Sequence, residues 1–391
     1  MNRLFVVCSF IAFACCALPT HVSAHSMDPN APWAVDVVMG YQDAVQPVTL
    51  GFLPTSSHTE AAGVSLRHVD IARSFFLDEH NVYSRVTLAA HGGEVTVDEA
   101  FATKTLTPTW SLTIGQVMPS IGLYNNQHEH RWLLNDLPLV YGALWGGQMS
   151  EGAVLATWSL DHDSSWALTQ KVGLYSTQAF DTQGNSGAVM WNNQFTYHAG
   201  SVSATLLTDV YFASLNERGM NLFSTDPTQH SHSSTYTDTF DGTLWQANAA
   251  LSLRWHSNYG ELTLNSEYQT RRDDGELSSV QGETLDATGD IRLDSWGAFT
   301  ELSWAGHSGL LLAVRQQTLG SQVELNNLAT NDLETSVLNN PEGTLNGFSW
   351  MFGYYFADSG NTKIKVQFND VDGWASVGPE WSAVLQQGYR F

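Results

Sequence analysis

Cysteine is nearly missing from this 391-residue chain, and the three that occur, Cys8, Cys15 and Cys16, all lie near the amino terminus. The rest of the sequence therefore offers no disulfide framework, no thiolate metal site and no cysteine nucleophile. A run of about 20 apolar residues, which a membrane-spanning helix needs, is missing as well. If the chain enters a membrane, strands must carry it there.

Positive charge is also scarce, because 16 Lys and Arg stand against 39 Asp and Glu. Residues 1–24 are typical of a signal peptide, with Arg3, an apolar stretch from Leu4 to Leu18 and a cleavage site at Val22-Ser23-Ala24. Cleavage there changes the formal net charge from −23 to −24. Such a charge would repel phosphate, so no nucleic-acid partner is expected, whereas a pore or surface that attracts cations suits it.

Apolar residues at every second position recur along residues 25–391, in segments of about ten residues separated by Gly, Asn, Asp and Ser. The segment 244–256 is the clearest, with its apolar row beginning at Trp245 and ending at Trp255. Successive side chains of a strand face opposite sides, so one row can face lipid and the other water. Tryptophans at both ends of a lipid-facing row fit the aromatic girdles of a transmembrane barrel. A soluble β-sandwich, the competing interpretation, would have shorter strands.

Segments of this kind predict sixteen strands, at residues 34–41, 63–71, 82–90, 94–102, 110–118, 153–160, 166–175, 188–198, 202–212, 244–256, 260–270, 294–304, 309–319, 347–356, 362–369 and 383–391. From the fifth strand onward, long connections alternate with short ones, as external loops alternate with periplasmic turns. The last strand, which ends at Phe391, should pair with the first and leave no edge in lipid. The expected fold class is all-β, a transmembrane antiparallel β-barrel of about sixteen strands that occupies residues 25–391.

The longest connection, from Pro119 to Gly152, is too apolar to lie in water. Its large apolar side chains need burial, and the barrel lumen is the only large cavity available. We therefore expect this loop after the fifth strand to fold inward and narrow the pore. The constriction would then be lined by His128, Glu129, His130, Trp132 and Asp136.

Two pairs of alternating histidines are candidate metal ligands. His128 and His130 point the same way on an extended backbone, and with Asp136 they could form a nitrogen and oxygen site for zinc or another divalent transition metal. Ordinary hydrogen bonds within a loop are the competing interpretation. His230 and His232 could capture metal loosely at the pore mouth, or could simply be solvated surface. No cofactor is required in any of these cases, and zinc is the one candidate.

A pattern in the loop resembles a known family. An Asn, a His-x-His, an aromatic residue, an Asp followed by Pro-Leu-Val, and then three glycines fall on Asn125 or Asn126, His128, His130, Trp132, Asp136, Pro138, Leu139, Val140, Gly146, Gly147 and Gly152. Residues 51–160 thereby resemble proteobacterial outer-membrane proteins labelled zinc-regulated outer-membrane receptors, which are distantly similar to phosphate-selective porins. Leu137 stands where that family usually has Arg, and the loss of this cation disfavours phosphate selectivity.

We therefore expect a porin-like channel in the outer membrane of a Gram-negative bacterium, for passive or facilitated diffusion of small solutes. The channel should favour cations, and zinc uptake is one expected use. Expected partners are outer-membrane lipid and lipopolysaccharide, the barrel-assembly machinery, and small solutes or divalent cations. Porins of sixteen strands are commonly trimers, so a homotrimer is one option.

Two other function classes compete with the channel. An adhesin or structural barrel is the first alternative, and an outer-membrane hydrolase is the second. No enzymatic activity is expected, because Ser257 beside His256 is a weak candidate pair and the sequence has no Gly-x-Ser-x-Gly elbow. Stepwise conductance in planar bilayers would separate a channel from the other classes.

Overall fold

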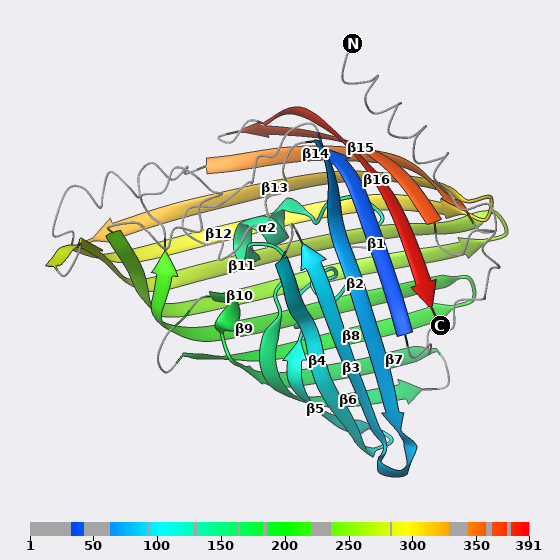
Figure 1. Ribbon diagram of the computed structural model, residues 1–391, viewed down its shortest axis with the longest axis horizontal. Coiled ribbons are helices and arrows are strands. Elements are labelled where there is room, and N and C mark those ends of the chain that lie inside the picture. The colour runs from blue at the N-terminus through cyan, green and yellow to red at the C-terminus, as the bar shows by residue number, and fades with distance from the viewer. Residues whose placement is uncertain are drawn as a thin grey trace.

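The structure, a computed structural model, describes residues 33–42, 63–91, 94–128, 131–162, 165–180, 182, 186–220, 236–281, 284–327, 343–356, 362–373 and 377–390. These residues form a closed antiparallel barrel of sixteen strands, each hydrogen-bonded to its neighbours in sequence (Figure 1). The predicted fold class and strand number are confirmed. The proposed signal peptide and Phe391 lie outside the described residues.

The strands of the first half are β1 (Trp33–Gln42), β2 (Gly63–Leu77), β3 (Val82–His91), β4 (Glu94–Thr107), β5 (Trp110–Val117), β6 (Glu151–His162), β7 (Trp166–Tyr175) and β8 (Gly187–Ala199). Those of the second half are β9 (Val202–Met220), β10 (Tyr236–Ser257), β11 (Gly260–Gln281), β12 (Thr284–Gly306), β13 (Leu310–Asn326), β14 (Gly343–Phe356), β15 (Thr362–Gly373) and β16 (Val377–Arg390). The described residues also form the short helices η1 (Asp78–His80), α2 (Leu139–Trp145) and η3 (Gln178–Phe180). Among the described residues, no helix is both long and apolar enough to cross a membrane.

The barrel closes between its first and last strands, as the sequence predicts. Val37 on β1 lies opposite Gln387 on β16, and the pairing continues to Gln42 opposite Ser382. Every strand therefore has two hydrogen-bonded neighbours, so no row of backbone N–H and C=O groups faces lipid unpaired.

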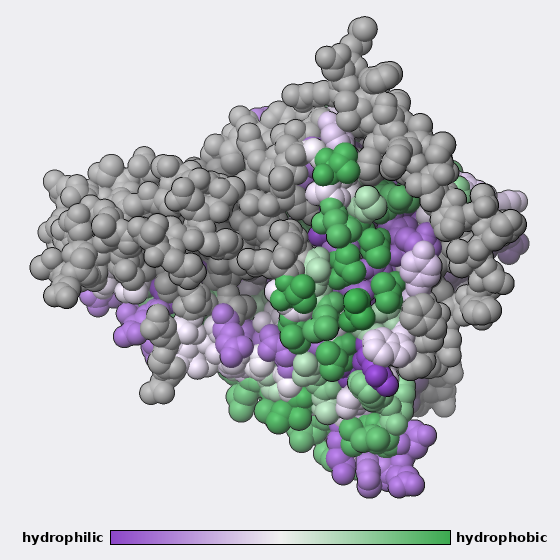
Figure 2. All heavy atoms as spheres, viewed as in Figure 1, coloured by the Kyte–Doolittle hydropathy of each residue, from purple (hydrophilic) through white to green (hydrophobic). Residues whose placement is uncertain are grey.

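The alternation in sequence becomes an apolar outer face and a polar inner face. On β10, Trp245 and Trp255 are exposed on the outside, whereas Gln246 and Asn248 between them are buried on the inside. Figure 2 shows the outer face as an apolar band over the first strands, bounded by hydrophilic residues at the turn between β2 and β3. The band is the surface expected to contact lipid.

Several strands are longer than the sequence pattern predicts. The prediction of a long connection at residues 271–293 is wrong, because β11 continues to Gln281 and β12 begins at Thr284. In this region the outer face carries charged side chains such as Arg272 and Asp294, and the inner face carries Leu277. The apolar row that marks a lipid-facing strand is therefore absent where these strands extend beyond the band.

Part of the lumen holds a hydrophobic core, which is unusual for a water-filled barrel. Inward-facing residues such as Phe240, Ile291 and Leu319 are buried there against residues from the segment between β5 and β6. That segment includes α2, which packs on β12 and β13 and lies within the ring of strands in Figure 1.

Candidate functional site

Residues 118–128 and 131–150, here called the constriction loop, enter the lumen as predicted. Ile121, Leu134, Tyr141 and Leu144 are fully buried, although a loop directed into solvent would expose them. The apolar side chains of this loop, which would be unfavourable in water, therefore form part of the core inside the barrel.

The first turn of the constriction loop is held by carboxylates of β9 and β11. The backbone N–H of Gly122 donates to Asp209 (3.0 Å), and that of Leu123 donates to Glu267 (2.8 Å). The Tyr141 hydroxyl also donates to Glu267, at 2.8 Å. Gly122 has φ +60°, and a Cβ there would lie 2.1 Å from the Tyr141 hydroxyl oxygen. Only glycine allows this approach.

Helix α2 is fixed to β11 and β13 at its two ends. At its start, the Leu139 N–H donates to the Gln317 side chain (2.9 Å), satisfying one of the free donors of the first turn. At its end, the Trp145 indole donates to Gln269 (3.0 Å), and the Arg271 guanidinium donates to the carbonyl of Leu144. Gly146 then ends the helix in a left-handed conformation (φ 75°).

A buried ion pair holds the next part of the constriction loop. Arg315 on β13 pairs with Glu301 on β12 (2.8 Å), and its second terminal nitrogen donates to the Asp136 carbonyl (3.0 Å). The Tyr124 hydroxyl donates to the other Glu301 oxygen, also at 2.8 Å. Both charges are almost completely buried, so the pair and these added hydrogen bonds together offset their loss of hydration.

The constriction loop also reaches β15 and β16. Lys365 on β15 donates to the carbonyls of Trp132 (3.2 Å) and Leu134 (3.3 Å). The Asn135 amide donates to Ser382 on β16 (2.9 Å). With contacts from β9 round to β16, the loop extends across the lumen instead of lining one side of it.

On a third side, the constriction loop meets β2 and β4 through His128. Its Nδ1 lies 3.5 Å from Asp70, and its Nε2 lies 3.1 Å from Glu99. Asp70 in turn lies 2.6 Å from Nε2 of His68 on the same strand. His68, Asp70 and His128 are buried, and each offers a ligand atom within 4.8 Å of the others.

The residues that we predicted to line the constriction have different surroundings. Trp132 is buried in the core and its indole donates to the Gln127 carbonyl (2.9 Å), whereas Asp136 keeps a third of its side chain exposed. Asp136 accepts hydrogen bonds from Gln367 (2.8 Å) and Asn369 (3.0 Å) on β15. Four predicted site residues lie outside the described residues: Glu129, His130, and both histidines of the second pair, His230 and His232.

Sequence reasoning did not identify His68, Asp70 and Glu99 as partners of His128. His68 and Asp70 are two residues apart in a predicted strand, so their shared face could have been read from the alternation. Their inward direction depends on a bulge in β2, where the register with β1 shifts between Val38 and Met39. The pairing of Leu66 with Met39 and His68 with Val38 leaves Arg67 as the extra residue.

The candidate hydrolase pair does not form a nucleophile and base. The Ser257 hydroxyl donates to the Gly260 carbonyl (2.9 Å) and so stabilises the turn between β10 and β11. His256 Nδ1 instead lies 3.0 Å from the carboxylate of Glu261 and is well exposed. A serine nucleophile needs its hydroxyl directed at the base, which is not the case here.

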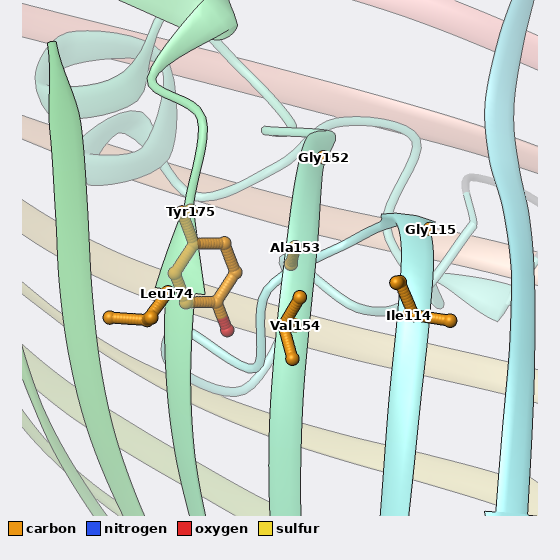
Figure 3. A pocket seen from close by; sticks show the side chains of 7 residues that line it. All are labelled: Ile114, Gly115, Gly152, Ala153, Val154, Leu174 and Tyr175. Atoms are coloured by element: carbon orange, nitrogen blue, oxygen red, sulfur yellow. The ribbon is translucent and has the colours of Figure 1, made fainter. Parts of the chain in front are cut away.

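An apolar groove lies on the outer surface where β5, β6 and β7 run side by side (Figure 3). Ile114, Val154 and Leu174 line it and are exposed on the lipid-facing side of the wall. Gly115 brings β4 and β5 close together, since a Cβ there would lie 2.2 Å from the Ala100 carbonyl oxygen. The groove therefore belongs to the lipid contact and not to the lumen.

Solved structures share this architecture. OmpT, an outer-membrane protein of Vibrio cholerae in its trimer form, aligns with a TM-score of 0.55 at 8% identity over 91% of this chain and 98% of that one. The outer-membrane channel DcaP of Acinetobacter baumannii aligns with a TM-score of 0.52 at 10% identity, over 94% of this chain and 100% of that one. This chain has the fold of these outer-membrane barrels.

OmpF of Salmonella typhi, in a complex with daunomycin, aligns equally well, with a TM-score of 0.52 at 12% identity over 91% of this chain and 97% of that one. No protein-family model matches the chain, and no curated protein matches its sequence. The structural likeness establishes the fold. The zinc-regulated label suggested by residues 51–160 stays a prediction.

Proposed function

We propose that the protein is a porin-like channel of the Gram-negative outer membrane, through which small solutes diffuse passively. The observation that carries the proposal is a folded loop held inside a closed transmembrane barrel by polar contacts with its wall. A loop in this position narrows the lumen of a barrel of this size and so selects solutes. The fold shared with the channel DcaP supports the same function.

We place the solute path on the side of β2, β3 and β4, beside the contact of His128 with Asp70 and Glu99. On the side of β9 to β13, the core around α2 fills the lumen. On the other side Asp136, Arg85 and Glu99 keep 33%, 22% and 17% of their side chains exposed. Water therefore reaches the carboxylates of Asp136 and Glu99, which pair with Arg67 (3.5 Å) and Arg85 (3.1 Å).

Cation preference is the finer part of the proposal. It is supported by the 39 acidic against 16 basic residues of the sequence, and by Asp136 and Glu99 at the constriction. Carboxylates beside a narrow path concentrate cations and repel anions. Divalent cations such as zinc are among the solutes that we propose for this path.

Planar-bilayer recordings test the proposal. Purified protein should produce stepwise conductance, and the reversal potential in a potassium chloride gradient should show preference for potassium. Steps that close in groups of three would support a homotrimer, the form in which the Vibrio cholerae protein is described. A barrel that inserts into the bilayer without conducting would instead favour an adhesin or structural role.

A further inference from the structure

Three residues with metal-ligand side chains meet where the constriction loop contacts the wall. His68 and Asp70 come from β2 and His128 from the loop, and their donor atoms lie within 4.8 Å of one another. We propose that His68, Asp70 and His128 bind a divalent transition metal ion, which joins the constriction loop to β2. The set differs from the pair of His128 and His130 that the sequence suggests.

The donor types select the class of metal. Two imidazole nitrogens and one carboxylate oxygen suit zinc and related first-row ions, whereas magnesium and calcium prefer oxygen donors. An ion bonded at about 2.1 Å in tetrahedral geometry separates its ligand atoms by about 3.4 Å. In the structure, Nε2 of His68 lies 2.6 Å from one Asp70 oxygen and Nδ1 of His128 lies 3.5 Å from the other, and the three donor atoms lie within 4.8 Å of one another. Small side-chain shifts would therefore admit an ion.

The surroundings of His128 resemble those of a metal ligand. A ligating histidine usually directs its second ring nitrogen at a carboxylate, which fixes the orientation of the ring. Here Nε2 of His128 lies 3.1 Å from Glu99 while Nδ1 faces Asp70. Glu99 is itself held by the Thr87 hydroxyl and by Arg85, each at 3.1 Å. Nδ1, which faces Asp70, is then the nitrogen directed at the proposed ion.

The charges near the site favour a cation. Asp36 on β1 lies directly opposite Asp70 on β2 and is buried too, so two carboxylates occupy neighbouring positions on the wall. Like charges in such a pair repel each other. Together with Glu99, which pairs with Arg85, they place three carboxylates near the two histidines. A divalent ion would reduce this repulsion.

The competing interpretation is a hydrogen-bonded network of the same residues that never holds metal. The two interpretations differ in what zinc does to the protein. A bound ion would fix the loop to the wall beside the proposed solute path, so zinc should lower the conductance. That effect rests on the proposed channel function, whereas binding of the ion does not.

Isothermal titration of the folded full chain in detergent, after removal of metal with a chelator, tests the binding. Zinc chloride should titrate to saturation and magnesium chloride should not. His68→Ala, Asp70→Asn and His128→Ala should each weaken zinc binding at least tenfold. His256→Ala is the matched control, because this exposed histidine of β10 pairs with Glu261 of β11 and not with β2 or the constriction loop, and it should leave the zinc titration unchanged.

The proposal is overturned if the wild-type protein does not bind zinc, or if His68→Ala and Asp70→Asn bind it with wild-type affinity. Loss of binding only in His130→Ala would point to the sequence-suggested pair and would also overturn it. If an alanine variant fails to fold, as judged by heat-dependent migration in gels, His68→Gln and His128→Gln keep the size and polarity of the side chain. Zinc binding without any conductance would refute the channel and leave the metal site standing.

Discussion

At the scale of single residues, the constriction loop depends on buried polar contacts, and loss of one partner leaves the other buried and unpaired. Arg315→Ala would leave Glu301 buried without its guanidinium partner and should lower the free energy of unfolding by about 3–5 kcal/mol. Urea unfolding in detergent, followed by tryptophan fluorescence, measures this loss. The control is Arg292→Ala, whose half-exposed pair with Asp294 should contribute only about 0–1 kcal/mol. Equal losses in the two variants would contradict the prediction.

Gly122 offers a second test at this scale. Gly122→Ala places a methyl group against the Tyr141 hydroxyl and Glu267, in addition to the strain of a positive φ. Gly200 has the same φ of +60° but nothing within 4 Å of a Cβ, so Gly200→Ala carries the backbone strain alone. We expect the constriction loop to leave the lumen more often in Gly122→Ala only. Trypsin cleavage after Arg131 should then be at least tenfold faster, and equal rates in both variants would refute the contact.

At the scale of elements, Trp145 is one of the residues that hold α2 to the wall. Its ring packs edge-on against Tyr211 at 5.4 Å between centroids, and its indole N–H donates to Gln269. Trp145→Ala should weaken the attachment of the helix by about 3–5 kcal/mol. The expected result in bilayers is a larger and noisier unitary conductance. Trp255→Ala, on the lipid-facing side, is the control and should conduct like the wild type.

At the scale of the whole molecule, the acid excess should make selectivity depend on salt. Exposed carboxylates act over about 10 Å at 0.1 M salt and over about 3 Å at 1 M. The permeability ratio of potassium to chloride should therefore be well above one at 0.1 M and fall toward one at 1 M. Reversal potentials at both concentrations measure it. A preference for chloride at low salt would mean that the basic residues, and not Asp136 and Glu99, control the path.

The barrel was largely predictable because lipid imposes a simple rule on each strand. The segments 110–118 and 244–256 carry apolar side chains at every second position, and both are strands with that row outside. The rule fails beyond the lipid, where the outer face of β11 and β12 is charged and the inner face is apolar. Their extended ends were therefore predicted to be a loop.

The sequence by itself determined that a strand barrel would form and that the loop after the fifth strand would enter it, because lipid and water each demand a particular side-chain pattern. Only the tertiary structure decided which wall residues hold that loop. His128 meets a strand 58 positions earlier in the sequence, through a bulge at Arg67 that directs His68 inward. Such contacts depend on strand register and on the path of a folded loop, which local alternation does not encode.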